Sequence, residues 1–180
     1  MAIGIISALV LLSIIFVLYR KRDLAYKILM KKNLELAKCD REILEKGDLI
    51  HPDILKKSDS NEPGFKNDID LIQKFNSFLT GEKPYLLNNI NIDDICSKIG
   101  TNRTYLSNAL KSVYNKSFNT IINEHRIRVA RQILTDPKYD HISIEGIGEM
   151  VGYKTRAAFH LNFKKHTGLT PSYFQASASK

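Results

Sequence analysis

Two stretches of the sequence place arginine, lysine and small polar side chains together at helical spacing. Residues 100–111 read G-T-N-R-T-Y-L-S-N-A-L-K, and residues 154–165 read K-T-R-A-A-F-H-L-N-F-K-K. Apolar residues recur every three or four positions in both, so the polar residues fall on the opposite face of each predicted helix. Arginine can donate two hydrogen bonds to guanine and asparagine can pair with adenine, whereas lysine, serine and threonine more often contact phosphate. These side chains therefore predict two surfaces that contact double-stranded DNA.

Individual contacts can be assigned from the type of each outward-facing residue. We expect contacts with bases from Arg103, Ser107, Asn108, Arg156 and His160. We expect contacts with phosphates from Lys111, Lys154, Thr155, Lys164 and Lys165. Thr104 completes the outward face of the first helix. The alternative for any one of these residues is an exposed side chain without a role in binding.

The elements that position the second stretch are marked by capping residues and glycines. Ser143 is a suitable N-cap for a short helix, and Gly152 breaks the chain after it. Thr155 can cap the next helix, which Gly168 ends in the left-handed conformation. Pro171 can occupy the first position of a last helix. Two short helices about a glycine turn, the second of them basic, are typical of a helix-turn-helix.

The first stretch belongs to an earlier copy of the same unit. A shift of 52 residues places Ile92, Ile95, Ile99 and Gly100 on Ile144, Ile147, Val151 and Gly152. Beyond the turn the shift is 53, and Asn115 falls on Gly168. Asparagine also tolerates the left-handed conformation, so both units end in the same way. Cys96 falls on Gly148, which predicts a small residue packed between helices.

One long helix is predicted between the two units. Ser117 caps it, apolar residues follow at helical spacing, and Asp136-Pro137 ends it near Leu134. His125 lies on the apolar stripe and is expected in the core. Arg126 is open to two interpretations, a structural partner or a further DNA contact, and we favour the structural one. A separate amphipathic helix is predicted from Asn67 to about Gly81.

The N-terminal third has a different character. Residues 2–19 carry no charge, and Arg20-Lys21-Arg22 follow at once. This pattern predicts a transmembrane helix over residues 1–19 rather than a cleaved signal peptide, because neither a basic start nor a small-residue cleavage site is present. The expected location is the inner (cytoplasmic) membrane, crossed once, with the DNA-binding domain in the cytoplasm. Residues 20–46 are expected as a juxtamembrane helix, either solvated or a dimerising stalk, and residues 47–66 as a linker.

Composition excludes several classes of function. The net charge of +8 suits nucleic acid or an anionic membrane surface as a partner. The two cysteines form no metal or disulfide motif, and the five histidines show no metal spacing. The sequence contains no nucleophile elbow and no phosphate-binding glycine loop. We therefore expect no enzymatic activity, no catalytic or metal site, and no cofactor. The alternative to a DNA-binding protein is a membrane-anchored interaction protein with a degenerate helix-turn-helix domain.

Residues 68–174 resemble the DNA-binding domain of the AraC-type transcription regulators. The segments that carry the resemblance are G-T-N-R-T-Y-L-S, F-N-x-x-I-N-E-H-R-I-x-x-A-R and V-G-Y-K-T-R-A-A-F-H-L-N-F-K-K-H-T-G-L-T-P-S-Y-F, in that order. The resemblance implies an all-α domain of seven helices over residues 67–180, with two helix-turn-helix units joined by a long helix. It also implies recognition helices in adjacent major grooves, and it makes RNA polymerase an expected partner. Leu161 stands where many members carry arginine, which puts one base contact in doubt.

The N-terminal part resembles membrane-anchored AraC-type members of the Bacteroidetes lineage, which place a sensor and a transmembrane helix before the domain. Y-K-I-L-M-K-K-N-L-E-L is similar to their juxtamembrane segment. The chain is then either the C-terminal piece of a longer sensor-regulator or a relative without a sensor. A homodimer through the stalk is possible in both cases.

Overall fold

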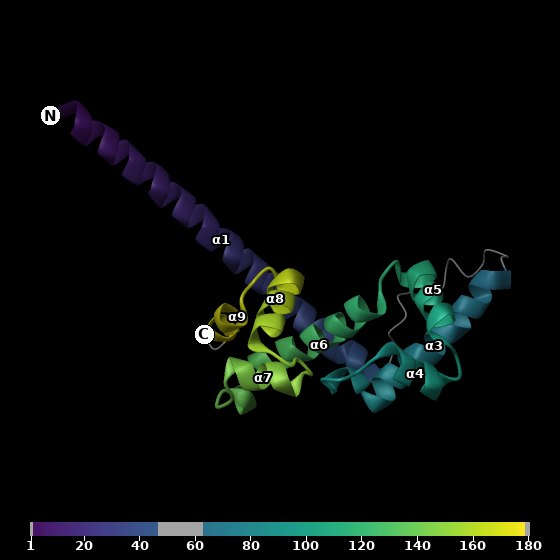
Figure 1. Ribbon diagram of the computed structural model, residues 1–180. Helices are drawn as coiled ribbons and strands as arrows, with labels where there is room; N and C mark the ends of the chain where they lie inside the picture. The colour runs from purple at the N-terminus through teal and green to yellow at the C-terminus, as the bar shows by residue number, and fades with distance from the viewer. Residues whose placement is uncertain (1, 47–62, 179–180) are drawn as a thin grey trace.

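The computed structural model describes residues 2–46 and 63–178, with side chains for residues 9–39 and 66–178. This part of the chain contains eight α-helices and two short 3-10 helices, and no strand. Helices α3 to α9 form two lobes at the two ends of α6, and α1 runs past one lobe and projects beyond it (Figure 1). The all-helical prediction is therefore confirmed for the described residues. The elements in order are α1 (Ala2–Lys46), α3 (Pro63–Glu82), η1 (Pro84–Leu86), α4 (Ile92–Ile99), α5 (Arg103–Tyr114), α6 (Phe118–Thr135), η2 (Pro137–Tyr139), α7 (Ile144–Met150), α8 (Arg156–Thr167) and α9 (Pro171–Ala178).

The first lobe has its own hydrophobic core. Ile72, Phe75 and Leu79 from α3 pack with Leu106 and Leu110 from α5. All five side chains are fully buried. Within each helix they are three or four residues apart, which places them on the one face that packs against the core. The start of α6 closes this core.

The second lobe has a separate core built from α6, α7, α8 and α9. Phe159 and Phe163 of α8 contact each other with ring centroids 5.7 Å apart, and Phe174 of α9 lies 5.3 Å from Phe163. Gly148 of α7 lies directly against Phe159: a Cβ added at Gly148 would be 3.0 Å from the ring. This close approach explains why the equivalent position in the first unit holds the small residue Cys96, which is buried.

The predicted caps are present at each helix that positions the two units. The side chains of Asn91, Asn102, Ser117, Ser143 and Thr155 each accept a hydrogen bond from the backbone N–H three residues further on. Each bond satisfies one of the N–H groups that a helix start leaves without a partner.

The two units also end alike, as the repeat predicts. Asn115 ends α5 with φ +53°, and Gly168 ends α8 with φ +74°. Asparagine is among the few residues other than glycine that adopt this conformation at low cost. The repeat found in the sequence is therefore a repeat of structure.

The N-terminal helix differs from the prediction in two ways. First, α1 is continuous from Ala2 to Lys46, with no break between the two predicted segments. Second, the predicted membrane location is wrong: no helix in the described part of the chain is both long and apolar enough to cross a bilayer. The apolar side chains described run from Leu9 to Tyr19, about 16 Å of helix against a hydrocarbon core of about 30 Å. The side chains of residues 2–8, the start of the predicted span, lie outside the described residues.

The segment predicted as a linker is described only at its end. Residues 47–62 lie outside the described residues, and residues 63–66 are already helical, because α3 begins at Pro63 rather than near Asn67. The sequence S-N-E-P-G, whose Pro63 and Gly64 are the first residues of α3, is a cluster of turn residues, which is why it predicts a loop. Proline is nevertheless well suited to the first position of a helix, where its missing N–H has no cost.

Candidate nucleic-acid interface

Helices α5 and α8 present equivalent outward faces at the two ends of α6. Leu106 and Leu110 hold the inner face of α5, and Phe159 and Phe163 hold the inner face of α8, all fully buried. The shift of 53 residues then matches the outward positions of the two helices in pairs. These pairs are Arg103 with Arg156, Thr104 with Ala157, Ser107 with His160, Asn108 with Leu161, and Lys111 with Lys164.

The predicted DNA-contacting residues lie on these faces with one exception. Arg103, Thr104, Ser107, Asn108, Lys111, Lys154, Thr155, Arg156, Lys164 and Lys165 are exposed. His160 is only partly exposed: its ring meets Phe159 edge-on at 6.1 Å, and its Nε2 is buried without a hydrogen-bond partner. The structure therefore places ten of the predicted residues at the surface and turns the eleventh partly towards the core.

The N-termini of both helices are held by caps that leave their first turns at the surface. The side chain of Asn102 accepts from the backbone N–H of Tyr105 at 3.0 Å, and Thr155 Oγ1 accepts from the N–H of Ala158 at 3.2 Å. Thr155 thus caps α8 with its oxygen, and its hydroxyl hydrogen is still available to a phosphate oxygen. A helix N-terminus also favours anions through its unpaired N–H groups.

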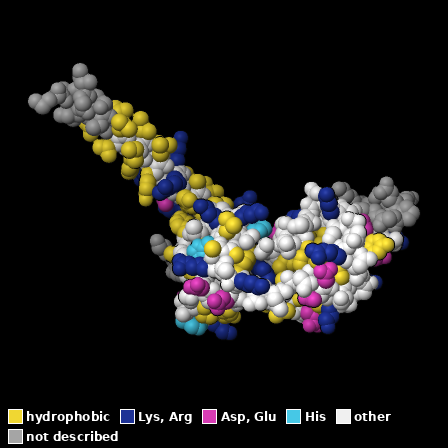
Figure 2. Space-filling model, viewed as in Figure 1, with side chains coloured by type: hydrophobic (Ala, Val, Ile, Leu, Met, Phe, Trp, Pro, Cys, Tyr) yellow, Lys and Arg dark blue, Asp and Glu magenta, His cyan; other side chains and the backbone are white. Residues whose placement is uncertain are grey.

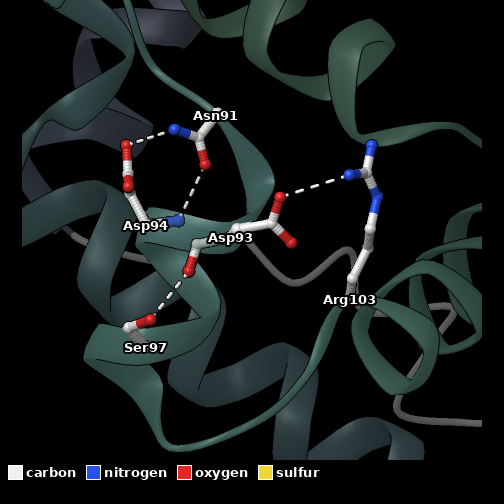
Figure 3. A network of polar contacts seen from close by, with 5 residues as sticks. All are labelled: Asn91, Asp93, Asp94, Ser97 and Arg103. Atoms are coloured by element: carbon white, nitrogen blue, oxygen red, sulfur yellow. Dashed lines mark hydrogen bonds and ion pairs between the residues drawn. The ribbon is translucent and has the colours of Figure 1, made fainter.

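Arg103 is held by an acidic residue of the neighbouring helix. Its Nη1 lies 3.2 Å from Oδ2 of Asp93 on α4, and both side chains are more than 60% exposed (Figure 3). Asp93 sits in the first turn of α4, beside the capping bonds of Asn91 with Asp94. An exposed ion pair of this kind is weak and can be replaced by another acceptor. The ion pair therefore orients the Arg103 side chain but leaves it able to bind another acceptor.

Two large exposed side chains on these helices bear on specificity. Leu161 is 71% exposed on α8, and Tyr105 is 66% exposed on α5. The sequence analysis singled out Leu161 and assigned no role to Tyr105. Tyr105 lies about 100° from buried Leu106 around the helix axis, and this angle could have indicated that Tyr105 is exposed. Both side chains can make apolar contacts with a partner, such as a thymine methyl group.

Arg126 of α6 links the two lobes and does not lie on the outward faces. Its Nε donates to the carbonyl oxygen of Tyr85 and its Nη2 to that of Leu87, each at 2.7 Å. The guanidinium carbon also lies 5.3 Å from the centre of the Tyr153 ring. The favoured structural interpretation is confirmed: Arg126 joins the η1 loop of the first lobe to the turn of the second.

Gly152 allows the close approach that this link needs. A Cβ there would lie 2.7 Å from the carbonyl oxygen of Tyr85 and 3.0 Å from Nε of Arg126, and φ is +90°. Burial raises the pKa of Tyr153 and lowers that of Arg126, each against the opposing influence of the other. These contacts bring the η1 loop, α6 and the turn after α7 together at one point.

Basic side chains are distributed over both lobes. Figure 2 shows Lys and Arg side chains on each lobe, with hydrophobic side chains along the projecting part of α1. Acidic groups are fewer in the chain, at 19 against 27 basic ones. This balance favours association with an anionic partner.

The fold and the matched faces define a tandem helix-turn-helix domain, and comparison with known proteins agrees. Residues 95–177 match a family model described as "Helix-turn-helix domain". The raffinose operon transcriptional regulatory protein of Pediococcus pentosaceus is 33% identical over 86 residues, which are 48% of this chain and 30% of that protein. An uncharacterised HTH-type transcriptional regulator of Pseudoalteromonas carrageenovora is 34% identical over 104 residues, 58% of this chain and 59% of that protein.

Residues 95–177 are therefore similar to a helix-turn-helix domain, and the two relatives are named as transcriptional regulators. The chain spans between about a third and three fifths of the length of these two relatives. Among solved structures, the C-terminal domain of AraT, a response regulator from Geobacillus stearothermophilus, is similar with a TM-score of 0.49 and 20% identity. That match covers 66% of this chain and 88% of the solved chain.

Proposed function

We propose that this chain is a transcription regulator that binds a specific double-stranded DNA sequence through α5 and α8. The observation that carries the proposal is the pair of matched outward faces, each of which has an exposed arginine at its start and an exposed lysine about two turns later, in the same order. A solvated surface does not require the same order twice, on two helices that are each capped and packed in the same way. The relatives that match this domain are also named as transcriptional regulators.

The spacing of the two helices supports contact with adjacent major grooves. Helix α6 has 18 residues and is about 27 Å long, and one unit lies at each of its ends. Successive turns of one DNA groove are about 34 Å apart along the duplex. We therefore expect a site made of two blocks with centres about 10 base pairs apart.

Within each block the side chains divide by chemistry. Arg103 and Arg156 are suited to bidentate contact with guanine, and Asn108 to contact with adenine. Leu161, at the position that matches Asn108, would favour a thymine methyl group, so the two blocks should differ in sequence. The phosphate contacts are assigned to the residues near the ends of the helices, namely Lys111, Lys154, Thr155, Lys164 and Lys165.

Two further partners follow from this function. A regulator that binds beside a promoter acts on RNA polymerase, and pairing of two copies would extend the DNA site as a repeat. Both stay predictions. No enzymatic role is proposed.

The test is selection of duplexes from a random library by the full chain at moderate salt. A two-block motif at the stated spacing would support the proposal, and Arg103→Ala and Arg156→Ala should each relax the preference in a different block. Lys138→Ala is the matched control, because Lys138 is exposed on η2, away from both faces. Binding without enrichment would leave only the phosphate contacts, which do not depend on sequence, and would contradict the proposal.

A further inference from the structure

One face of α1 packs into the core of the second lobe. Met30, Asn33 and Ala37 are 6%, 3% and 6% exposed, and they recur every three or four residues. The opposite face of the same segment is open, with Leu24 and Ile28 exposed at 60% and 61%. Residues 26–37 of α1 are therefore not solvated on all sides. Their buried face is occupied within the chain itself.

The central contact joins α1 to the last residue of α8. Asn33 Nδ2 donates to the carbonyl oxygen of Thr167 at 3.0 Å and to that of Leu29 at 2.9 Å. The last carbonyl groups of a helix have no partner within the helix, so Asn33 supplies one to α8. Thr167 in turn donates from Oγ1 to the carbonyl of Phe163 at 2.8 Å and accepts from the N–H of Leu169. Because Thr167 is buried, this arrangement has little access to water that could replace Asn33.

Two neighbouring contacts fix α1 at the turn between α8 and α9. Leu29 lies against Gly168 so closely that a Cβ on this glycine would be 2.7 Å from Leu29 Cδ2. The rings of Tyr26 and Tyr173 lie with centroids 5.3 Å apart. Beyond Tyr26 towards the N-terminus, a polar cavity of about 340 Å³ separates α1 from the turn, with Arg22 and Lys164 among its lining residues. The tight contact therefore covers the C-terminal end of α8 and stops at Tyr26.

Within the described residues, the contact of α1 involves the core of the second lobe and not that of the first. The core of the second lobe includes Met30, and Tyr26, Leu29 and Leu34 pack against it. Among the described residues, the core of the first lobe contains nothing from α1. A change in the position of α1 therefore reaches α8 directly, whereas α5 is held by α3 and α4.

We propose that docking of α1 controls the second DNA-contacting helix separately from the first. With residues 26–37 docked, α8 is held at its C-terminal end and both helices bind DNA. With α1 displaced, the carbonyl oxygen of Thr167 loses its hydrogen-bond donor and the second core loses Met30. Helix α8 then no longer binds its block of the DNA site, while α5 still binds its own. A signal that moves α1 would then convert a two-block DNA site into a one-block site. This inference rests on the proposed function and adds its regulation.

The test compares two variants that place the same charge on opposite faces of α1. Met30→Glu buries a carboxylate in the contact, and Ile28→Glu, two residues away, places it in solvent. The unaltered full chain and both variants are footprinted on the duplex that the unaltered chain selects. Each protein is also footprinted on two further duplexes, in each of which the sequence of one block is scrambled. We expect Met30→Glu to lose protection of the α8 block and roughly tenfold or more in affinity, while the α5 block stays protected. Ile28→Glu should match the unaltered chain.

Two results would overturn the proposal: Met30→Glu protects both blocks normally, or it loses both blocks while its circular dichroism stays that of the unaltered chain. If Met30→Glu does not fold, Asn33→Ala decides the matter, because it removes the hydrogen bond without adding charge. In Asn33→Ala, amide hydrogen exchange should increase in the last turn of α8 and not in α5. An increase of the same size in both helices, or no increase in α8, would contradict the proposed control of α8 by α1. Failure of the unaltered chain to select any motif is a different result, since it contradicts the proposed function itself.

Discussion

The guanidinium of Arg126 donates to the carbonyl oxygen of Tyr85 at 2.7 Å, and so connects α6 to a loop forty-one residues earlier in the chain. The same side chain donates to Leu87 and lies over the ring of Tyr153. Arg126 thus donates hydrogen bonds to carbonyl groups at the end of η1 and also contacts the turn of the second unit. Arg126 therefore joins the η1 loop to α6 through two hydrogen bonds from its side chain to backbone carbonyl groups.

Replacing Arg126 should loosen this arrangement. Arg126→Gln keeps a polar side chain but is too short to reach both carbonyl groups, so the free energy of unfolding should fall by about 1–3 kcal/mol. Chemical denaturation measures the change. Lys74→Gln is the control, because Lys74 is exposed on α3 and its replacement changes helix propensity little. An equal effect of the two substitutions would show that Arg126 has no special structural role.

Removing the acidic partner of Arg103 should strengthen binding to DNA. Asp93→Asn keeps the shape of the side chain, removes a charge that repels phosphate, and releases Arg103 for a base. We expect a severalfold higher affinity, measured by fluorescence anisotropy on the selected duplex, with little change in stability because the ion pair is exposed. Asp140→Asn removes the same charge from the exposed residue after η2. If it raises the affinity equally, the effect is one of net charge and the pair does not restrain Arg103.

The buried histidine of α6 should make stability depend on pH. His125 is stacked on Tyr85 with ring centroids 5.1 Å apart, and burial, with a smaller influence from Arg128, lowers its pKa from 6.5 to about 3. Below pH 6.5 the unfolded chain therefore binds a proton that the folded chain does not. The free energy of unfolding should fall as the pH is lowered from 6.5 towards 3, by at most about 1.4 kcal/mol per pH unit.

Denaturation at pH 7.5 and 5.5 measures this change, with an expected loss of about 1.4 kcal/mol from His125 alone. Burial also lowers the pKa of His166, which acts in the same direction. His125→Phe keeps a ring against Tyr85 and removes the proton, so its dependence on pH should be weaker by that amount. An unchanged dependence in this variant would place the effect elsewhere.

Local sequence rules predicted the two units well because their determinants are local. Asn102, Thr155, Asn115 and Gly168 act on backbone groups within four residues of themselves, so their types and spacing are enough to locate α5 and α8. The exposed faces follow from the same spacing. His160 shows the limit: helical position placed it outward, whereas its contact with Phe159 draws the ring partly inward.

Contacts distant in sequence were not predictable in the same way. Asn33 meets Thr167 across 134 residues, and nothing near Asn33 indicates a partner. Leu29 and Leu36 are seven residues apart, as in a coiled-coil seam, and Asn33 is a polar residue that weakens such a seam. In the structure Asn33 is the buried residue and Leu36 is 43% exposed. A polar residue within an apolar face can mark a specific partner as well as a poor interface, and only the tertiary structure distinguishes the two.

Helix α6 belongs to both hydrophobic cores, and this sets how the protein can change over evolution. Its residues Ile121 and Ile122 lie in the first core, and Ile127, Ala130 and Leu134 lie in the second. Inserting one residue between these groups would rotate one unit by about 100° relative to the other and move it by about 1.5 Å. For the proposed DNA contact, a small insertion would turn one of α5 and α8 away from the duplex. The proposed function thus predicts that DNA sites diverge in sequence through single substitutions on α5 and α8, whereas the separation of the two blocks is conserved.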